Sequence, residues 1–501
     1  MSEPAEEIRR AAAGGVVWTA TSQAVRQVLQ VAVTAILARY LVPEDFGMIG
    51  MAAVTLAFVA PLNEMGMGAA LIQRKDLSPR HATAVFWSQI AMASAVAALM
   101  AAGAPIVAGF FKRPDLVPLL RLMCWNLPVG AAASAPQALL ARRLSFGRIA
   151  AVETISLAGA GAIAAAMAVT GWGVWSLAGQ ALAGTAITTI LVIPMSGISP
   201  LSRADRPTRA HLMELARFSA PLTGYQLLNF LSRNIDDILI GRFLGAEALG
   251  FYQMAYRVMM YPLQKVSGIV GRVSFPAFAS MQDDTERIRR GYLRTVRYIA
   301  LVTFPMMAAV MVAAPELTGV LFGPAWAPVA SLIVVLSLAG MAGSIGTTVG
   351  SLFLSRGRSD LMLKWELVAS TCYAAAIAFG LMWGLMGVAV SYTITALILW
   401  PISHVIANRL IDLPMKSFFH ALVPQALLAV SLASVLLAVK VIWLPAEPVA
   451  QAAFLVSCAA IGAGALACAA WAGRPAAAAE ALALVREAFS GMRRSGRRVA
   501  P

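Results

Sequence analysis

Charged side chains lie within apolar stretches of this 501-residue chain. The segment SRNIDDILIGRFLG (232–245) holds Arg233, Asp236 and Asp237, and Arg26 and Arg257 lie in other apolar stretches. Ionised groups in a membrane interior are costly, so they face protein or water and mark transport pathways. The in-span arginines, whose guanidinium groups offer several hydrogen-bond donors, are therefore candidate residues of a transport pathway.

Polar residues accompany Arg26 along one side of its predicted helix. Gln23, Arg26, Gln27 and Gln30 follow the i, i+3, i+4, i+7 spacing of a single helical face. A polar stripe at that depth must face protein or water, so we expect all four side chains to line the substrate passage.

The central charge cluster has two interpretations. Arg233, Asp236 and Asp237 share a helical face, so Arg233 can pair with either aspartate. One arginine neutralises one carboxylate, and the other then needs another cation, a proton or a sodium ion. The cluster is therefore either a structural ion pair that docks the helix or a site that couples transport to H+ or Na+. No other cofactor is expected.

The composition places these residues in a membrane. Hydrophobic residues make up 59% of the chain, charged residues 13%, and the mean hydropathy is +0.76, which excludes a single-domain water-soluble fold. The four cysteines lie in apolar windows without CxxC spacing or a nearby histidine, so neither a disulfide framework nor a metal site is expected. The N-terminal segment lacks the features of a cleaved secretory signal.

Apolar windows long enough to cross a hydrocarbon core of about 30 Å recur along the whole chain. They predict an all-α polytopic membrane protein with about fourteen transmembrane helices, at residues 14–38, 46–66, 84–109, 117–139, 149–169, 173–195, 213–240, 248–271, 295–315, 327–354, 363–381, 384–407, 418–441 and 448–471.

Basic residues predict the orientation of these spans. Most of the 39 lysines and arginines fall in loops that are cytoplasmic if the N-terminus is inside, as the positive-inside rule requires. Both termini are then cytoplasmic, and few basic residues lie in or beside external loops: Arg39, Lys112, Arg113, Arg242 and Lys440. Glu153 and Glu366 lie where they can reach the headgroups. The net charge of +15 is therefore mainly an orientation signal, and no basic stretch interleaved with exposed aromatics suggests a nucleic-acid partner.

An internal repeat divides the chain. ILARYLVPEDFGMIGMA (36–52) aligns with LIGRFLGAEALGFYQMA (239–255) at a constant offset of 203 residues. The matched positions predict two pseudo-symmetric six-helix lobes at residues 1–200 and 201–410. Two appended helices (411–472) and a basic cytoplasmic tail (473–501) follow.

Several motifs resemble polysaccharide-transport members of the multidrug/oligosaccharidyl-lipid/polysaccharide flippase superfamily: LARYLVPEDFG (37–47), ALIQRKDLS (70–78), RNIDDILIGRFLGAEALGFYQMAYRV (233–258), FPAFASMQDD (275–284) and LFGPAW (321–326). The resemblance implies a flippase of the bacterial inner membrane that moves an undecaprenyl-diphosphate-linked oligosaccharide by alternating access, for exopolysaccharide or lipopolysaccharide synthesis. It implies the lipid bilayer, a polysaccharide polymerase and a chain-length regulator as partners.

Other classes of protein fit the sequence less well. An enzyme would need a large external loop for its catalytic residues, and every predicted external connection is short. A nucleotide-driven pump would need a GxxxxGK[ST] sequence, which is absent from the chain. The main alternative is a cation-coupled antiporter of drugs or other small molecules from the same superfamily.

Overall fold

The computed structural model describes residues 23, 25–64, 71, 79–143, 145–197, 230, 233–279, 281, 284–443 and 447–472. Regular secondary structure within these residues is helical, without strands, which confirms the predicted all-α class. Nine segments of the described residues are long and apolar enough to cross a membrane. The predicted first span, the linker before the second lobe and the basic tail lie wholly or partly outside the described residues.

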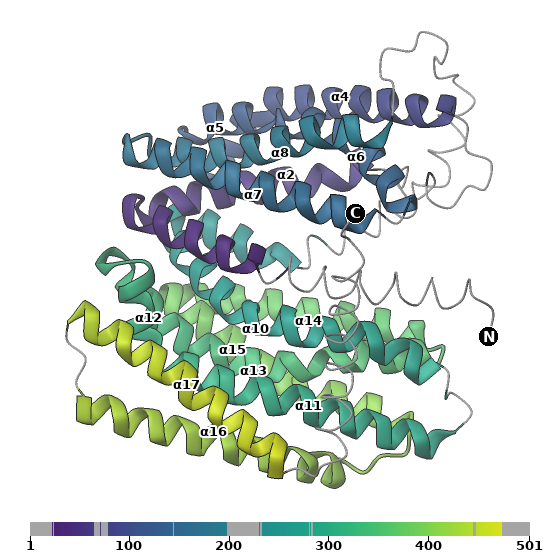
Figure 1. Ribbon diagram of the computed structural model, residues 1–501, viewed down its shortest axis with the longest axis vertical. Helices are drawn as coiled ribbons and strands as arrows, with labels where there is room; N and C mark the ends of the chain where they lie inside the picture. Colours follow the sequence, from purple (N-terminus) through teal and green to yellow (C-terminus); the bar gives the residue numbers. More distant parts are fainter. Residues whose placement is uncertain are drawn as a thin grey trace, which may run out of the picture. The chain divides into compact units, whose positions relative to one another are not determined.

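The chain divides into two compact units. One comprises Met1–Asn234 with Arg474–Pro501, and the other comprises Ile235–Gly473. The lobe boundary predicted at residues 200 and 201 falls in the 198–229 stretch, outside the described residues. Within each unit the long helices run side by side (Figure 1).

The described part of the N-terminal unit includes a helix over residues 25–40. It continues with α2 (Pro43–Glu64), α4 (Pro79–Phe111), α5 (Leu116–Met123), α6 (Asn126–Arg142), α7 (Phe146–Val169) and α8 (Val174–Ser196). The predicted span 117–139 falls within a single apolar stretch, Leu116–Arg142, in which a short turn at Cys124 and Trp125 separates α5 from α6. Pro128 has no N–H group to donate to the carbonyl of Cys124, which instead accepts from the Leu127 N–H.

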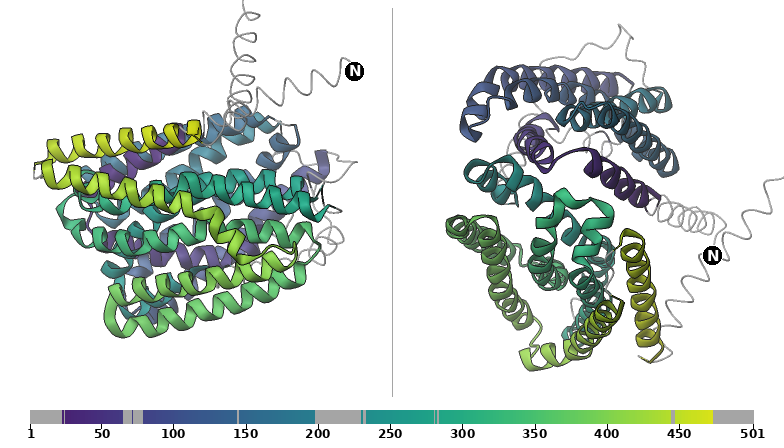
Figure 2. Two further views of the ribbon diagram at one scale, coloured as in Figure 1. Left: turned by 90° about the horizontal axis from the view of Figure 1, so that it is seen from below. Right: turned by 90° about the vertical axis from the view of Figure 1, so that its left-hand side faces the viewer.

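The C-terminal unit begins with a helix over residues 235–243 that continues from residue 233. It continues with α10 (Gly245–Ala279), α11 (Thr285–Val312), α12 (Ala314–Leu321), α13 (Ala327–Ser355), α14 (Ser359–Gly380), α15 (Gly384–Arg409), α16 (Met415–Trp443) and α17 (Pro448–Ala472). Helix α10 packs against α13, and α11 packs against both α13 and α16. Helix α14 packs against α15, and α16 packs against α17 (Figure 2).

The core of the C-terminal unit lies among α11, α13, α15 and α16. Tyr292, Leu352, Ala407 and Phe418 are fully buried there. Because α11 starts at Thr285 and α10 ends at Ala279, both helices extend beyond their predicted spans (295–315 and 248–271). A hydropathy window finds the part of a helix that lies in hydrocarbon and misses an amphipathic extension beyond it.

The two repeat segments have the same local structure. The N–H of Leu41 donates to the carbonyl of Leu37 over 2.9 Å, and the N–H of Leu244 donates to that of Ile240 over 2.8 Å. These positions correspond at the offset of 203 residues. Each bond closes the last turn before a short connection into the next helix, so the sequence match reflects a matching hairpin in each unit.

Candidate functional site

Arg26, in the N-terminal unit, forms an ion pair with Glu153 of α7. The Arg26 side chain is 18% exposed and that of Glu153 is 43% exposed. The sequence predicts that Glu153 reaches the headgroups, whereas the structure turns it towards Arg26. The pair lowers the free-energy cost of holding Arg26 within the protein, and the Arg26 Nε is buried without a hydrogen-bond partner among the described residues.

The predicted polar stripe around Arg26 is partly covered. Gln27 and Gln30 are half-buried, whereas Gln23 is exposed. Val25 and Val28 on the same helix are exposed, at 51% and 72%. Arg26, Gln27 and Gln30 are therefore more buried on this helix than the two valines.

Polar pairs between other helices of the N-terminal unit were not predicted. The Thr188 hydroxyl donates to Ser156 of α7 over 2.8 Å, and the Thr185 hydroxyl donates to Asn126 of α6 over 2.9 Å. These bonds join α8 to two neighbours. Small polar residues within apolar spans are a sequence signal for such hydrogen bonds between helices. The signal does not identify the partner helix.

Asp236, in the C-terminal unit, is buried beside a tyrosine. The Tyr252 hydroxyl donates to Asp236 Oδ2 over 3.0 Å, and the two side chains are 0% and 8% exposed, respectively. Tyr252 lies on α10, in the helix that follows the one carrying Asp236. The sequence predicts an intrahelical partner, Arg233, whereas the structure provides a neutral donor from α10; Arg233 itself is exposed.

Asp237 also has its partners on α10. Its side chain is hydrogen-bonded with Gln253 and is attracted electrostatically by Arg257, which is exposed. Gln253 and Arg257 are four residues apart and therefore share a helical face. The structure thus brings together three predicted site residues, Asp236, Asp237 and Arg257, with a pairing that the sequence did not reveal.

Three more tyrosines extend this site. Tyr256 stacks on Tyr252 with ring centroids 5.7 Å apart and is hydrogen-bonded with Tyr392 of α15. The ring centroid of Tyr373, on α14, is 5.0 Å from that of Tyr392. We call Tyr252, Tyr256, Tyr373 and Tyr392 the tyrosine cluster. The YxxxY spacing of 252 and 256 is a sequence signal for two of its members, but it equally fits ordinary core packing.

The ligand set of this site suits a proton or a monovalent cation. Two neighbouring carboxyl groups and several hydroxyl groups offer oxygen atoms in an apolar surrounding. The described residues contain no group of three or more His, Cys, Asp or Glu residues that could hold a metal ion. An aspartate whose nearest partner is neutral keeps its negative charge uncompensated, which favours binding of a cation.

The fold of this chain resembles the folds of two solved membrane proteins. The chain resembles "Lipid II flippase MurJ, inward closed conformation" with a TM-score of 0.70 and 12% identity, covering 90% of this chain and 97% of that one. It also resembles an inward-facing multidrug resistance MATE family transporter of the MOP superfamily, with a TM-score of 0.63 and 14% identity over 79% and 98% of the chains.

The chain belongs to the polysaccharide biosynthesis protein family, whose model matches residues 36–331. Lipopolysaccharide biosynthesis protein WzxC of Escherichia coli K12 is 27% identical over 78% of this chain and 80% of its own length. Teichuronic acid biosynthesis protein TuaB of Bacillus subtilis is 27% identical over 83% and 86%. Succinoglycan biosynthesis transport protein ExoT of Rhizobium meliloti is 28% identical over 72% and 73%. The predicted resemblance to polysaccharide-transport proteins is confirmed.

Proposed function

We propose that this protein is a flippase of the bacterial inner membrane that moves an undecaprenyl-diphosphate-linked oligosaccharide from the cytoplasmic to the periplasmic leaflet. The product enters exopolysaccharide or lipopolysaccharide synthesis, where a polymerase and a chain-length regulator use it. The family, the names of the curated relatives and the fold support this proposal. The observation that carries it is the placement of Arg26 and Arg257 beside carboxylates within apolar helical units.

The chemistry of the substrate explains why arginines are needed. The polyprenyl tail can stay in the bilayer, but the anionic diphosphate and the sugars cannot cross hydrocarbon. We propose fourteen spans, which form two six-helix lobes and two appended helices. Movement of the lobes opens a hydrated passage alternately to either side of the membrane. Arg26, Arg233 and Arg257 bind the diphosphate oxygens in this passage, and Gln23, Gln27 and Gln30 bind sugar hydroxyl groups.

Asp236 and Asp237 couple this movement to H+ or Na+. Arg257 is attracted to Asp237 and is also exposed, so a diphosphate competes with Asp237 for the same guanidinium group. When Arg257 binds the diphosphate, Asp237 loses its cationic partner and its affinity for a proton or a sodium ion rises. Substrate and ion therefore favour each other's binding, as reciprocal linkage requires.

Flipping of a fluorescent polyprenyl-diphosphate sugar in proteoliposomes tests this function. Arg26→Ala and Arg257→Ala are expected to abolish flipping by the protein that is inserted in the membrane, so flipping is normalised to the amount of protein in each proteoliposome sample. Arg358→Ala is the matched control, because Arg358 is an exposed arginine outside the proposed passage. Normal flipping by both variants would contradict the proposal.

The alternative is a cation-coupled antiporter of drugs or small molecules, which the similarity to a MATE transporter supports. The same proteoliposomes separate the two functions. Efflux of a cationic dye against an imposed H+ or Na+ gradient, without flipping of the lipid-linked sugar, would favour the antiporter.

From the charge distribution we propose that both termini lie in the cytoplasm. A cysteine introduced at Ser78 is then expected to resist a membrane-impermeant maleimide in intact cells and to react after the membrane is opened. Strong labelling in intact cells would contradict this orientation.

A further inference from the structure

The first four turns of α11 carry arginines on one face. Arg287, Arg290, Arg294 and Arg297 are exposed and follow an i, i+3, i+7, i+10 spacing. The opposite face is fully buried through Ile288, Tyr292, Val296 and Ile299. We call the four exposed residues the arginine stripe.

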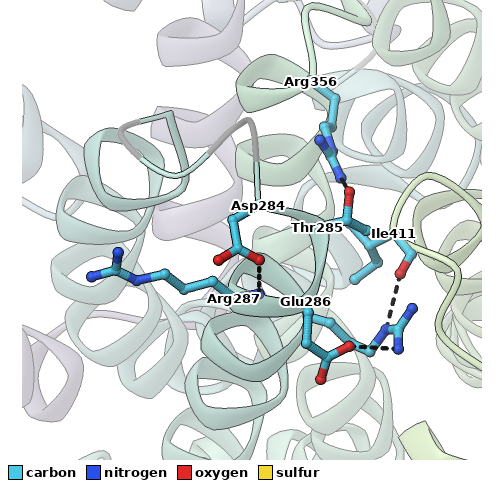
Figure 3. Close-up of polar contacts among 7 residues, drawn as sticks. Asp284, Thr285, Glu286, Arg287, Arg356 and Ile411 are labelled. Atoms are coloured by element: carbon cyan, nitrogen blue, oxygen red, sulfur yellow. Dashed lines mark hydrogen bonds and ion pairs between the residues drawn. The ribbon is translucent and has the colours of Figure 1, made fainter.

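Contacts around the start of α11 fix the direction of this face. The Asp284 side chain accepts from the Arg287 N–H over 2.9 Å, and an Arg356 Nη donates to the Thr285 hydroxyl over 2.7 Å. Arg289 donates to the carbonyl of Ile411 over 3.1 Å. In Figure 3 the Arg287 side chain extends away from Ile411 and Arg356. The first turn is therefore anchored to two other segments of the unit while Arg287 stays exposed.

Acidic residues are scarce on the helix that carries the stripe. Glu286 is the one acidic residue within α11, and its carboxylate is engaged by Arg289 over 2.8 Å. Asp284 is the N-cap and already accepts from the backbone. The exposed face thus presents guanidinium groups along about 15 Å, at a rise of about 1.5 Å per residue.

The length of α11 places the stripe at the membrane surface. Its 28 residues make a helix about 42 Å long, whereas the hydrocarbon core is about 30 Å thick. The charged end must therefore extend into the headgroup layer. Tyr298 follows the stripe, and its hydroxyl accepts from the Arg294 Nε over 3.2 Å, an arrangement typical of the membrane interface.

We propose that the arginine stripe binds the phosphate groups of anionic phospholipids in the cytoplasmic leaflet. Guanidinium groups bind phosphate oxygens in bidentate fashion, and the cytoplasmic surface attracts basic residues electrostatically. A positive-inside signal needs basic residues but no particular face, whereas phosphate binding needs the shared face that α11 provides. The lipid acts as a partner of the C-terminal unit, separate from any lipid-linked substrate.

The full chain, reconstituted in phosphatidylcholine nanodiscs with and without phosphatidylglycerol, tests this surface. Native mass spectrometry measures the lipids that each protein retains. The test variant combines Arg287→Gln, Arg290→Gln, Arg294→Gln and Arg297→Gln. The control removes the same charge from exposed residues of other elements by Arg148→Gln, Lys364→Gln, Arg409→Gln and Lys416→Gln. We expect the stripe variant to retain about 10-fold less phosphatidylglycerol than the control.

Two further measurements keep the proposal falsifiable if the stripe variant folds poorly. A variant with lysine at all four positions should keep the preference for phosphatidylglycerol, and high salt should weaken it. Equal retention of phosphatidylcholine and phosphatidylglycerol by the unaltered protein would overturn the proposal, as would equal losses in stripe and control variants. In nanodiscs that also contain a polyprenyl diphosphate, loss of that lipid alone by the stripe variant, with phosphatidylglycerol retained, would assign the stripe to the substrate instead.

Discussion

The hydroxyl group of Tyr252 donates a hydrogen bond of 3.0 Å to the buried carboxylate of Asp236. The partner of this carboxylate is thus a neutral group from the next helix. A neutral donor offsets part of the desolvation cost without cancelling the negative charge. A carboxyl group that is buried beside a neutral donor gains free energy by binding a proton or a cation, which is why we propose Asp236 as a coupling residue.

Loss of this hydrogen bond should destabilise the C-terminal unit. Tyr252→Phe leaves the Asp236 carboxylate buried without its donor, so we expect a loss of about 1–3 kcal/mol in unfolding free energy. Thermal unfolding of purified protein measures it, with Tyr298→Phe at an exposed tyrosine as the control. In an Asp236→Asn background the Tyr252→Phe penalty should shrink. Additive effects of the two changes would show that the bond does not couple these residues.

A close helix contact gives a second prediction. A Cβ atom built on Gly387 would overlap the backbone carbonyl of Gly380, so α14 and α15 approach each other at backbone distance. Because a backbone carbonyl cannot rotate away, Gly387→Ala should lower the melting temperature and the amount of protein in the membrane. Gly346→Ala is the control, since a Cβ at that helical position meets nothing within 4 Å. Equal melting temperatures for the two variants would contradict this packing.

Helix positions were largely predictable because a membrane span needs a continuous apolar window of fixed length. The predicted spans 149–169 and 384–407 compare with α7 (Phe146–Val169) and α15 (Gly384–Arg409). The turn between α5 and α6 was missed because its residues are as apolar as the helices around it. Hydropathy indicates whether a segment lies in hydrocarbon or in water. It does not indicate whether the helix is continuous along that segment.

The charged residues of the candidate site could be predicted from the sequence, but the residues that they contact could not. Arg26, Asp236 and Asp237 stand out because ionised groups are rare in apolar windows. Their partners Glu153 and Tyr252 lie on other helices, and a single sequence does not show which helices pack together. Tyrosine also fits an ordinary core or interface position, so the tyrosine cluster had no distinctive signal.

An ion pair between α16 and α12 gives a third prediction. Lys440, in the last turn of α16, lies 2.9 Å from the buried carboxylate of Glu316 on α12 and donates to the carbonyl of Val312. Lys440→Met strands the Glu316 charge and should reduce stability by about 3–5 kcal/mol. The double variant Lys440→Met, Glu316→Gln should recover most of this loss, as measured by thermal unfolding.

The exposed pair of Arg358 and Asp360 provides the comparison for this test. Their side chains are 45% and 48% exposed, and Asp360→Asn should leave the melting temperature unchanged. A double variant at Lys440 and Glu316 that is no more stable than Lys440→Met alone would show that the charges do not act as a pair.

The ion pair of Arg26 and Glu153 allows its structural and functional roles to be separated. Single changes, Arg26→Ala or Glu153→Ala, each strand a charge and should lower both stability and transport. The exchange Arg26→Glu, Glu153→Arg keeps an ion pair between the same two helices, so it should restore much of the protein in the membrane. If Arg26 also binds the diphosphate, the exchange moves the guanidinium group to α7 and flipping stays lost. Membrane abundance and flipping in proteoliposomes are measured together. Restored abundance with full flipping would assign Arg26 to helix docking and leave Arg257 to bind the diphosphate.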